Sequence, residues 1–135
     1  MLNKNAPLWQ IAFRPFFLGA SIFILLAFAL WTLVLSNSFP ALLADYQPYG
    51  GWFNWHSHEM IFGFVQAIAI GFLLTASRNW AGQAGISSNF IKLLFASWLL
   101  ARIAWLIPAS PTFFVVLFDS ATPLLAAFGL AQTLQ

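Results

Sequence analysis

The sequence predicts an all-α fold, an integral membrane bundle of four transmembrane helices, and two observations support this. First, the 135 residues are 61% hydrophobic and only 6% charged, with a mean hydropathy of +0.85, whereas soluble domains carry roughly 25% charged residues. Second, the chain contains four separate apolar runs, each long enough to cross a hydrocarbon core about 30 Å thick. The five basic residues are scattered, so the composition does not indicate a nucleic-acid-binding surface.

Each apolar run is expected to form one span. The first follows Arg14 and Pro15 and is too long for the apolar core of a signal peptide, which has about 7–15 residues. Arg78 follows the second run, Lys92 lies close enough to the start of the third to reach the interface, and Pro123 is expected to kink the fourth. We expect the spans at 16–36, 60–77, 90–107 and 113–134, within a single membrane domain covering 1–135.

The distribution of basic residues predicts the orientation of the chain. If the spans alternate, one side of the membrane receives Lys4, Arg14, Arg78 and Lys92. The opposite loops, around Asp45 and Pro108, contain no Lys or Arg, and segment 37–55 carries the Tyr and Trp residues typical of the headgroup level. The positive-inside rule therefore predicts that both termini are cytoplasmic and that the second span begins at the outer face.

The segment Trp55–Met60 holds both histidines and the only glutamate of the chain. Ionisable groups near a bilayer are costly, so they mark a candidate functional site. Imidazole is the commonest protein ligand of transition metals, and it also binds haem iron, which makes His56 and His58 candidate ligands. Glu59 is a candidate acceptor that would orient one of the rings. Because the chain has no cysteine, any metal depends on histidine, methionine and carboxylate.

The relative placement of the two histidines is open at this point. At 100° per residue, His56 shares a helix face with Glu59 and with three small residues spaced four apart. The three are Gly63, Ala67 and Gly71. Such a face lets another helix, or a flat macrocycle, approach the backbone closely. In a regular helix His58 points about 160° away from His56, so the pair cannot chelate one ion; if residues 54–58 are extended, it can.

A simpler interpretation of this segment needs no ligand. His56 and His58 would be interfacial residues hydrogen-bonded to loop carbonyls, and Glu59 would be favoured by the positive end of the helix dipole.

Arg102 and Asp119 fall at matching depths below the outer hairpin, about 7 to 10 Å into the third and fourth spans. Pairing removes most of the cost of either charge alone, which favours an ion pair between the two helices. Alternatively, Arg102 contacts a haem propionate or another anionic ligand and Asp119 accepts a proton. Trp98 and Trp105 share a helical stripe with Arg102, a pattern that favours packing over the wall of a cofactor site.

Several motifs together resemble those of one known family, the NnrS family. They are FRPFFLG at 13–19, WHSHEMIFGF at 55–64, GFLLTA at 71–76 and NWAG at 79–82, followed by Arg102 and Asp119. Members of that family are multi-span bacterial membrane proteins that contain haem and copper and belong to the response to nitric oxide and nitrosative stress. The resemblance implies an inner-membrane protein in which His56 and His58 are metal ligands and Glu59, Arg102 and Asp119 contact the cofactor. Family members have several times as many spans, so the chain corresponds to the N-terminal third of a larger protein.

The leading hypothesis is therefore a haem-binding membrane protein of the nitric oxide response, with copper as a second metal. Its expected partners are the lipid bilayer, nitric oxide or a related small molecule, and either the missing spans or further copies of this chain. Whether it turns a substrate over is not indicated by any motif. The alternative hypothesis is a transporter or channel segment without a cofactor, in which Glu59, Arg102 and Asp119 relay protons or anions. A third is a purely structural fragment.

Overall fold

The computed structural model describes residues 7–38, 45–82 and 84–134. In these ranges the chain is helical and contains no strand. A short helix, η1 (Pro7–Gln10), precedes α1 (Phe13–Leu35), and the second span is built from three consecutive segments, α2 (Trp52–His58), η3 (Glu59–Val65) and α3 (Gln66–Ala81). The third and fourth spans are α4 (Ser88–Leu106) and α5 (Thr112–Thr133). Four helices are long and apolar enough to cross a membrane, which confirms the predicted all-α membrane bundle.

The second span is longer than the sequence indicated. Its helix runs without a break over the 30 residues Trp52–Ala81, so both histidines lie inside it. The extended conformation considered for residues 54–58 is therefore wrong, and with it the geometry in which both rings close on one metal from alternate positions. The other three spans begin and end within a few residues of the predicted bounds.

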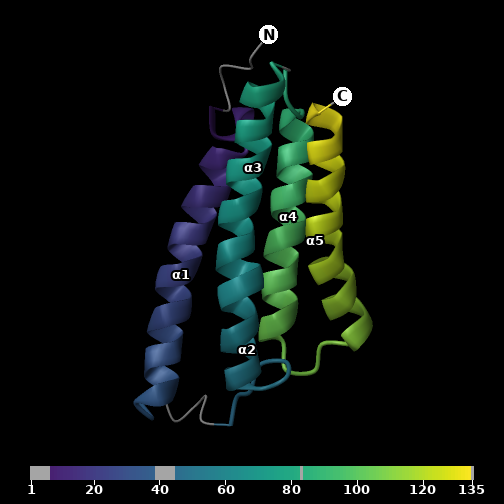
Figure 1. The fold of residues 1–135 in the computed structure, drawn as a ribbon. Coiled ribbons are helices and arrows are strands. Elements are labelled where there is room, and N and C mark those ends of the chain that lie inside the picture. The colour runs from purple at the N-terminus through teal and green to yellow at the C-terminus, as the bar shows by residue number, and fades with distance from the viewer. Residues whose placement is uncertain (1–6, 39–44, 83, 135) are drawn as a thin grey trace.

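The four spans run up and down, so the ends of the bundle alternate along the chain (Figure 1). At one end, the backbone N–H of Phe13 in α1 donates to Thr75 Oγ1 in α3 at 3.0 Å. At the same end, Thr133 Oγ1 in α5 donates to Ser77 Oγ at 3.0 Å. We call this the basic end because it carries Arg14, Arg78 and Lys92. The predicted alternation of the spans is thus confirmed, whereas Lys4 lies outside the described residues and the orientation in the membrane stays a prediction.

The segment before α2 closes the opposite end of the bundle by capping α4. The Tyr46 hydroxyl donates to the backbone carbonyl of Leu106, and the N–H of Tyr49 donates to the carbonyl of Trp105 at 3.0 Å. Both carbonyls belong to the last turn of α4, where no intrahelical donor is left for them. Burial raises the pKa of the Tyr46 hydroxyl above its ordinary value, so it remains a donor. The aromatic loop therefore has a specific structural role in addition to its affinity for the interface.

The small residues predicted to share a face do so, and α1 covers them. Gly63, Ala67 and Gly71 are all buried. Side chains of α1 fill the space that these residues leave, because a Cβ atom at Gly71 would lie 2.9 Å from Phe16 Cβ and one at Gly63 would clash with the ring of Phe23. The close approach that this stripe permits is therefore made by a helix.

A π-helical segment, η3, explains why residues four apart stay on one buried face of the second span. In this segment backbone bonds skip one residue more than in an α-helix; for example, the N–H of Gln66 donates to the carbonyl of Ile61. The wider turn keeps Trp55, Glu59 and Gly63 buried in register with the small residues of α3. It also allows Trp98 Nε1 of α4 to donate to the Gly63 carbonyl at 2.9 Å. Such insertions are frequent at functional sites.

Candidate functional site

Glu59, Arg102 and Asp119 meet inside the bundle near the end opposite to the basic end. Glu59 is completely buried and Arg102 is only 4% exposed. The NH2 group of Arg102 donates to Asp119 Oδ1 at 2.8 Å, which confirms the ion pair predicted between the third and fourth spans. The NH1 group of Arg102 lies 3.2 Å from Glu59 Oε2, close enough for an ion pair but not aligned for a hydrogen bond. Arg102 thus lies between two carboxylates contributed by different helices.

His58 completes this group. Its Nδ1 lies 3.1 Å from Glu59 Oε1 and its Nε2 lies 3.1 Å from Asp119 Oδ2. The ring is stacked between Trp105, at a centroid distance of 3.8 Å, and Phe62, at 4.7 Å. The two stacked rings fix the orientation of the imidazole plane, and the two carboxylates fix the direction of its nitrogens. We refer to His58, Glu59, Arg102 and Asp119 as the charge cluster.

The protonation of the charge cluster follows from its geometry. A neutral imidazole has one N–H and one lone pair, yet both nitrogens of His58 face carboxylate oxygens. The arrangement is satisfied if His58 is protonated, or if one of the carboxyl groups carries that proton. In either form, counting Arg102 as a cation, the four side chains sum to zero net charge. A neutral cluster is the form that costs least inside a membrane.

Trp105 supports the carboxylate of Asp119. Its Nε1 donates to Asp119 Oδ2 at 2.5 Å while its ring covers His58. The stripe of Trp98, Arg102 and Trp105 on α4 was interpreted from the sequence as packing, and for Trp98 this is confirmed by its place in the hydrophobic core. Trp105, in contrast, is a polar partner of the charge cluster.

His56 faces the other side of the span, toward α1. Its ring is stacked on Trp31 at a centroid distance of 4.2 Å and meets the edge of Phe28 at 6.4 Å. Its Nδ1 is buried and has no hydrogen-bond partner. The predicted divergence of His56 and His58 in a regular helix is confirmed. Glu59 borders the predicted slot, because a Cβ atom at Gly63 would lie 2.7 Å from its Oε2, but its contacts differ from those of His56. Glu59 turns into the charge cluster and His56 packs against aromatic rings.

These side chains fit a single-imidazole ligand better than a chelate. Among the described residues, no three His, Asp or Glu side chains are arranged to hold a metal ion. Both nitrogens of His58 are engaged by carboxylates, so this ring binds a metal only if a carboxylate is displaced. His56 has a buried nitrogen with no partner, and an unsatisfied polar atom of this kind needs an explanation. Of the two rings, His56 is therefore the one with a nitrogen that no carboxylate engages.

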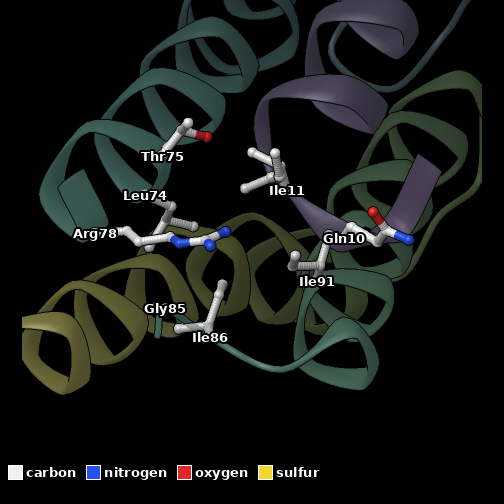
Figure 2. A pocket seen from close by; sticks show the side chains of 9 residues that line it. Gln10, Ile11, Leu74, Thr75, Arg78, Gly85, Ile86 and Ile91 are labelled. Carbon is white, nitrogen blue, oxygen red and sulfur yellow. The ribbon is translucent and has the colours of Figure 1, made fainter. Parts of the chain in front are cut away.

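A pocket at the basic end does not resemble a cofactor site. Its lining includes Ile11, Leu74, Ile86 and Ile91, with no histidine or carboxylate. Figure 2 shows the side chain of Arg78 extending into this pocket. The arginine stem packs over Gly85, where an added Cβ would lie 2.8 Å from Arg78 Cδ. The stem of Arg78 is thus packed within the protein at the end of its span.

The relay hypothesis grouped Glu59 with Arg102 and Asp119, and the structure brings these three side chains together. The sequence did not indicate that His58 would join them, nor that Trp31 and Phe28 would surround His56. The one available signal was depth, because all four members of the charge cluster lie near the same end of their spans. Helix faces could not be assigned from depth, because depth says nothing about the direction in which a side chain points.

Four membrane-length helices around a buried cluster of ionisable side chains define an integral membrane bundle with a polar site near one end. Within that class, the model of the NnrS protein family matches residues 7–135, and the chain belongs to the NnrS family. This confirms the resemblance seen in the motifs. No curated protein and no solved structure matches the chain.

Proposed function

We propose that this protein binds haem in the response to nitric oxide and nitrosative stress, with copper as a second metal, at the end of the bundle that holds the two histidines. Membership of the NnrS family supports the physiological context. The observation that carries the assignment is the buried, unpartnered Nδ1 of His56. In an environment where every polar group needs a partner, a free imidazole nitrogen is suited to a metal.

In this proposal each site residue has a distinct role. His56 is the primary ligand, while His58 is a second ligand that becomes available when a carboxylate moves away from its ring. Glu59, Arg102 and Asp119 contact the cofactor or its acidic substituents and hold a proton beside it. Ferrous haem or copper(I), when bound, supplies the centre to which nitric oxide coordinates. Because nitric oxide is small and apolar, it reaches such a site through lipid and the apolar helix faces.

The proposal also covers location and assembly. The basic residues of one end support an orientation with both termini in the cytoplasm of a bacterium, and hence a site near the outer face of the inner membrane. A single imidazole is sufficient protein ligation for haem iron, but it leaves copper short of donors. We propose that further spans of the full-length protein, or a second copy of this chain, complete the coordination.

The test is a spectrum of the protein purified in detergent from cells supplied with haem and copper, together with its metal content. His56→Ala is expected to abolish the Soret band, and added imidazole is expected to restore part of it. His58→Ala is expected to shift the band or reduce its intensity. Trp80→Phe, at an exposed residue of the basic end, serves as the control. A Soret band that is unchanged in both histidine variants would contradict the ligand assignment.

A second candidate function is supported by the charge cluster itself. Within the membrane-spanning region, Arg102 and His58 each connect Glu59 to Asp119. Such series serve as proton or anion relays in transporters and channels. This function requires flux across proteoliposomes made with metal-free protein, and Glu59→Gln should reduce the flux strongly. Absence of flux in the unmodified protein would exclude the relay.

A further inference from the structure

The pocket at the basic end lies where several helices meet. Its lining comes from η1 and the residues just before α1, from the last two turns of α3, and from the loop and first turn that begin α4. Arg78 belongs to the last turn of α3, and Trp80, two residues later, is 71% exposed. An exposed tryptophan at the end of a span is typical of the headgroup level of a membrane, so the pocket lies at that level.

Arg78 brings an unpaired positive charge into this pocket. Figure 2 shows its guanidinium group among the lining side chains. Within the part of the chain that the structure describes, every ion pair lies at the opposite end, and Arg78 makes no hydrogen bond or ion pair. The three acidic residues of the sequence, Asp45, Glu59 and Asp119, also belong to that opposite end. Because Arg78 is half-buried between helices and loses part of its hydration there, a bound anion would stabilise it.

Size and polarity determine which kind of anion fits. The free volume of the pocket is only about 10 Å³, which is room for one atom of the size of a water oxygen. A whole sugar or nucleotide does not fit, whereas one oxygen of a phosphate group does, with the rest of the phosphodiester remaining in the headgroup layer outside. Ile11, Leu74, Ile86 and Ile91 line the same pocket. An apolar lining favours an amphiphilic anion over a free, fully hydrated one.

We propose that this pocket binds the phosphate group of an anionic phospholipid. Arg78 donates hydrogen bonds to a non-bridging phosphate oxygen, and the acyl chains lie along the apolar faces of the bundle. Basic pockets between transmembrane helices bind the head groups of anionic lipids, and the planar donors of arginine match phosphate. The histidines lie at the other end of the bundle, so the inference does not depend on the proposed binding of haem.

The test is a titration of the protein in detergent micelles with dioctanoyl phosphatidylglycerol, followed by native mass spectrometry. Arg78→Gln removes the charge-assisted hydrogen bonds and should weaken binding roughly tenfold. Lys92→Gln is the matched control, because it removes the same charge from an exposed position of the same end that does not line the pocket. Since salt screens such an exposed charge, binding should change less than about twofold. Arg78→Lys keeps the charge and should lose less affinity than Arg78→Gln, and circular dichroism checks that each variant is folded.

Three outcomes would overturn the proposal. Equal weakening in Arg78→Gln and Lys92→Gln would mean that the lipid responds only to the overall charge of the basic end. Equally strong binding of dioctanoyl phosphatidylcholine, unchanged in Arg78→Gln, would mean that the protein holds only the acyl chains. Displacement of the lipid by an equal concentration of inorganic phosphate would assign the pocket to a soluble phosphate.

Discussion

The imidazole of His58 and the carboxylate of Asp119 lie 3.1 Å apart, Nε2 to Oδ2, although they belong to the second and the fourth span. Together with the contacts of Arg102, this links the second, third and fourth spans at one depth. Four ionisable groups of the bundle are thus concentrated in one place, near the end opposite to the basic end. Their concentration explains how an otherwise apolar chain tolerates four of them within its membrane-spanning helices, since each faces at least one opposite charge.

Removal of one member of the charge cluster should destabilise the bundle strongly. In Asp119→Asn, Arg102 loses the negative charge that it pairs with, and the amide offers one acceptor oxygen in place of the two that accept from Arg102 and Trp105. Breaking a buried ion pair in this way is expected to lower the free energy of unfolding by about 3–5 kcal/mol. The measurement is thermal or denaturant unfolding in detergent micelles.

Asp45→Asn is the matched control, because Asp45 is exposed and lies before the second span. Its effect should stay within about 0.5 kcal/mol, as for other surface substitutions. Similar stabilities of the two variants would show that the cluster contributes little to folding.

The two histidines should differ in their contribution to stability. His58→Gln disturbs contacts with two carboxylates and two aromatic rings, whereas Nδ1 of His56 has no partner to lose. We expect His58→Gln to cost about 1–3 kcal/mol more than His56→Gln in protein without cofactor. Unfolding curves of both variants, recorded side by side, provide the comparison. A greater loss in His56→Gln would mean that stacking on Trp31 outweighs the polar contacts of His58.

The contact between α1 and α3 should depend on Gly71. A Cβ atom there would lie 2.9 Å from Phe16 Cβ and 3.2 Å from the Phe17 ring, so Gly71→Val must push α1 away. Overpacking of this kind costs about 1–3 kcal/mol. The exposed Ala69 on the same helix provides the control Ala69→Val. If thermal unfolding in detergent is the same for both variants, α1 is not packed against this face.

The orientation can be tested because the chain contains no cysteine. Ala84→Cys places a thiol between α3 and α4 at the basic end, and Ala109→Cys places one in the opposite hairpin; both alanines are exposed. With the basic end in the cytoplasm, a membrane-impermeant maleimide should label Ala109→Cys in intact spheroplasts and Ala84→Cys only after lysis. The reverse pattern would show that the protein is inserted the other way.

Much of this architecture is determined by the sequence alone. Apolar runs of membrane length dictate the number of helices, because unpaired backbone groups cannot remain in lipid. Because the loops between the runs are short, successive spans cross the membrane in opposite directions. This brings Arg102 and Asp119 to the same depth, and they pair because an isolated charge in the membrane is costly. Family membership was likewise evident from the motifs at 13–19 and 55–64.

Only the tertiary structure decided which side chains complete the site. Glu59 contacts Arg102 and His58 inside the bundle, whereas His56 packs against the aromatic rings of α1, and a rule of 100° per residue, which places both on one face, does not anticipate this difference. His58 lies between two carboxylates, and His56 stacks on Trp31. The physical reason is that hydropathy specifies how deep a residue lies in the membrane, whereas its direction depends on local helix geometry and on the neighbouring helix it packs against.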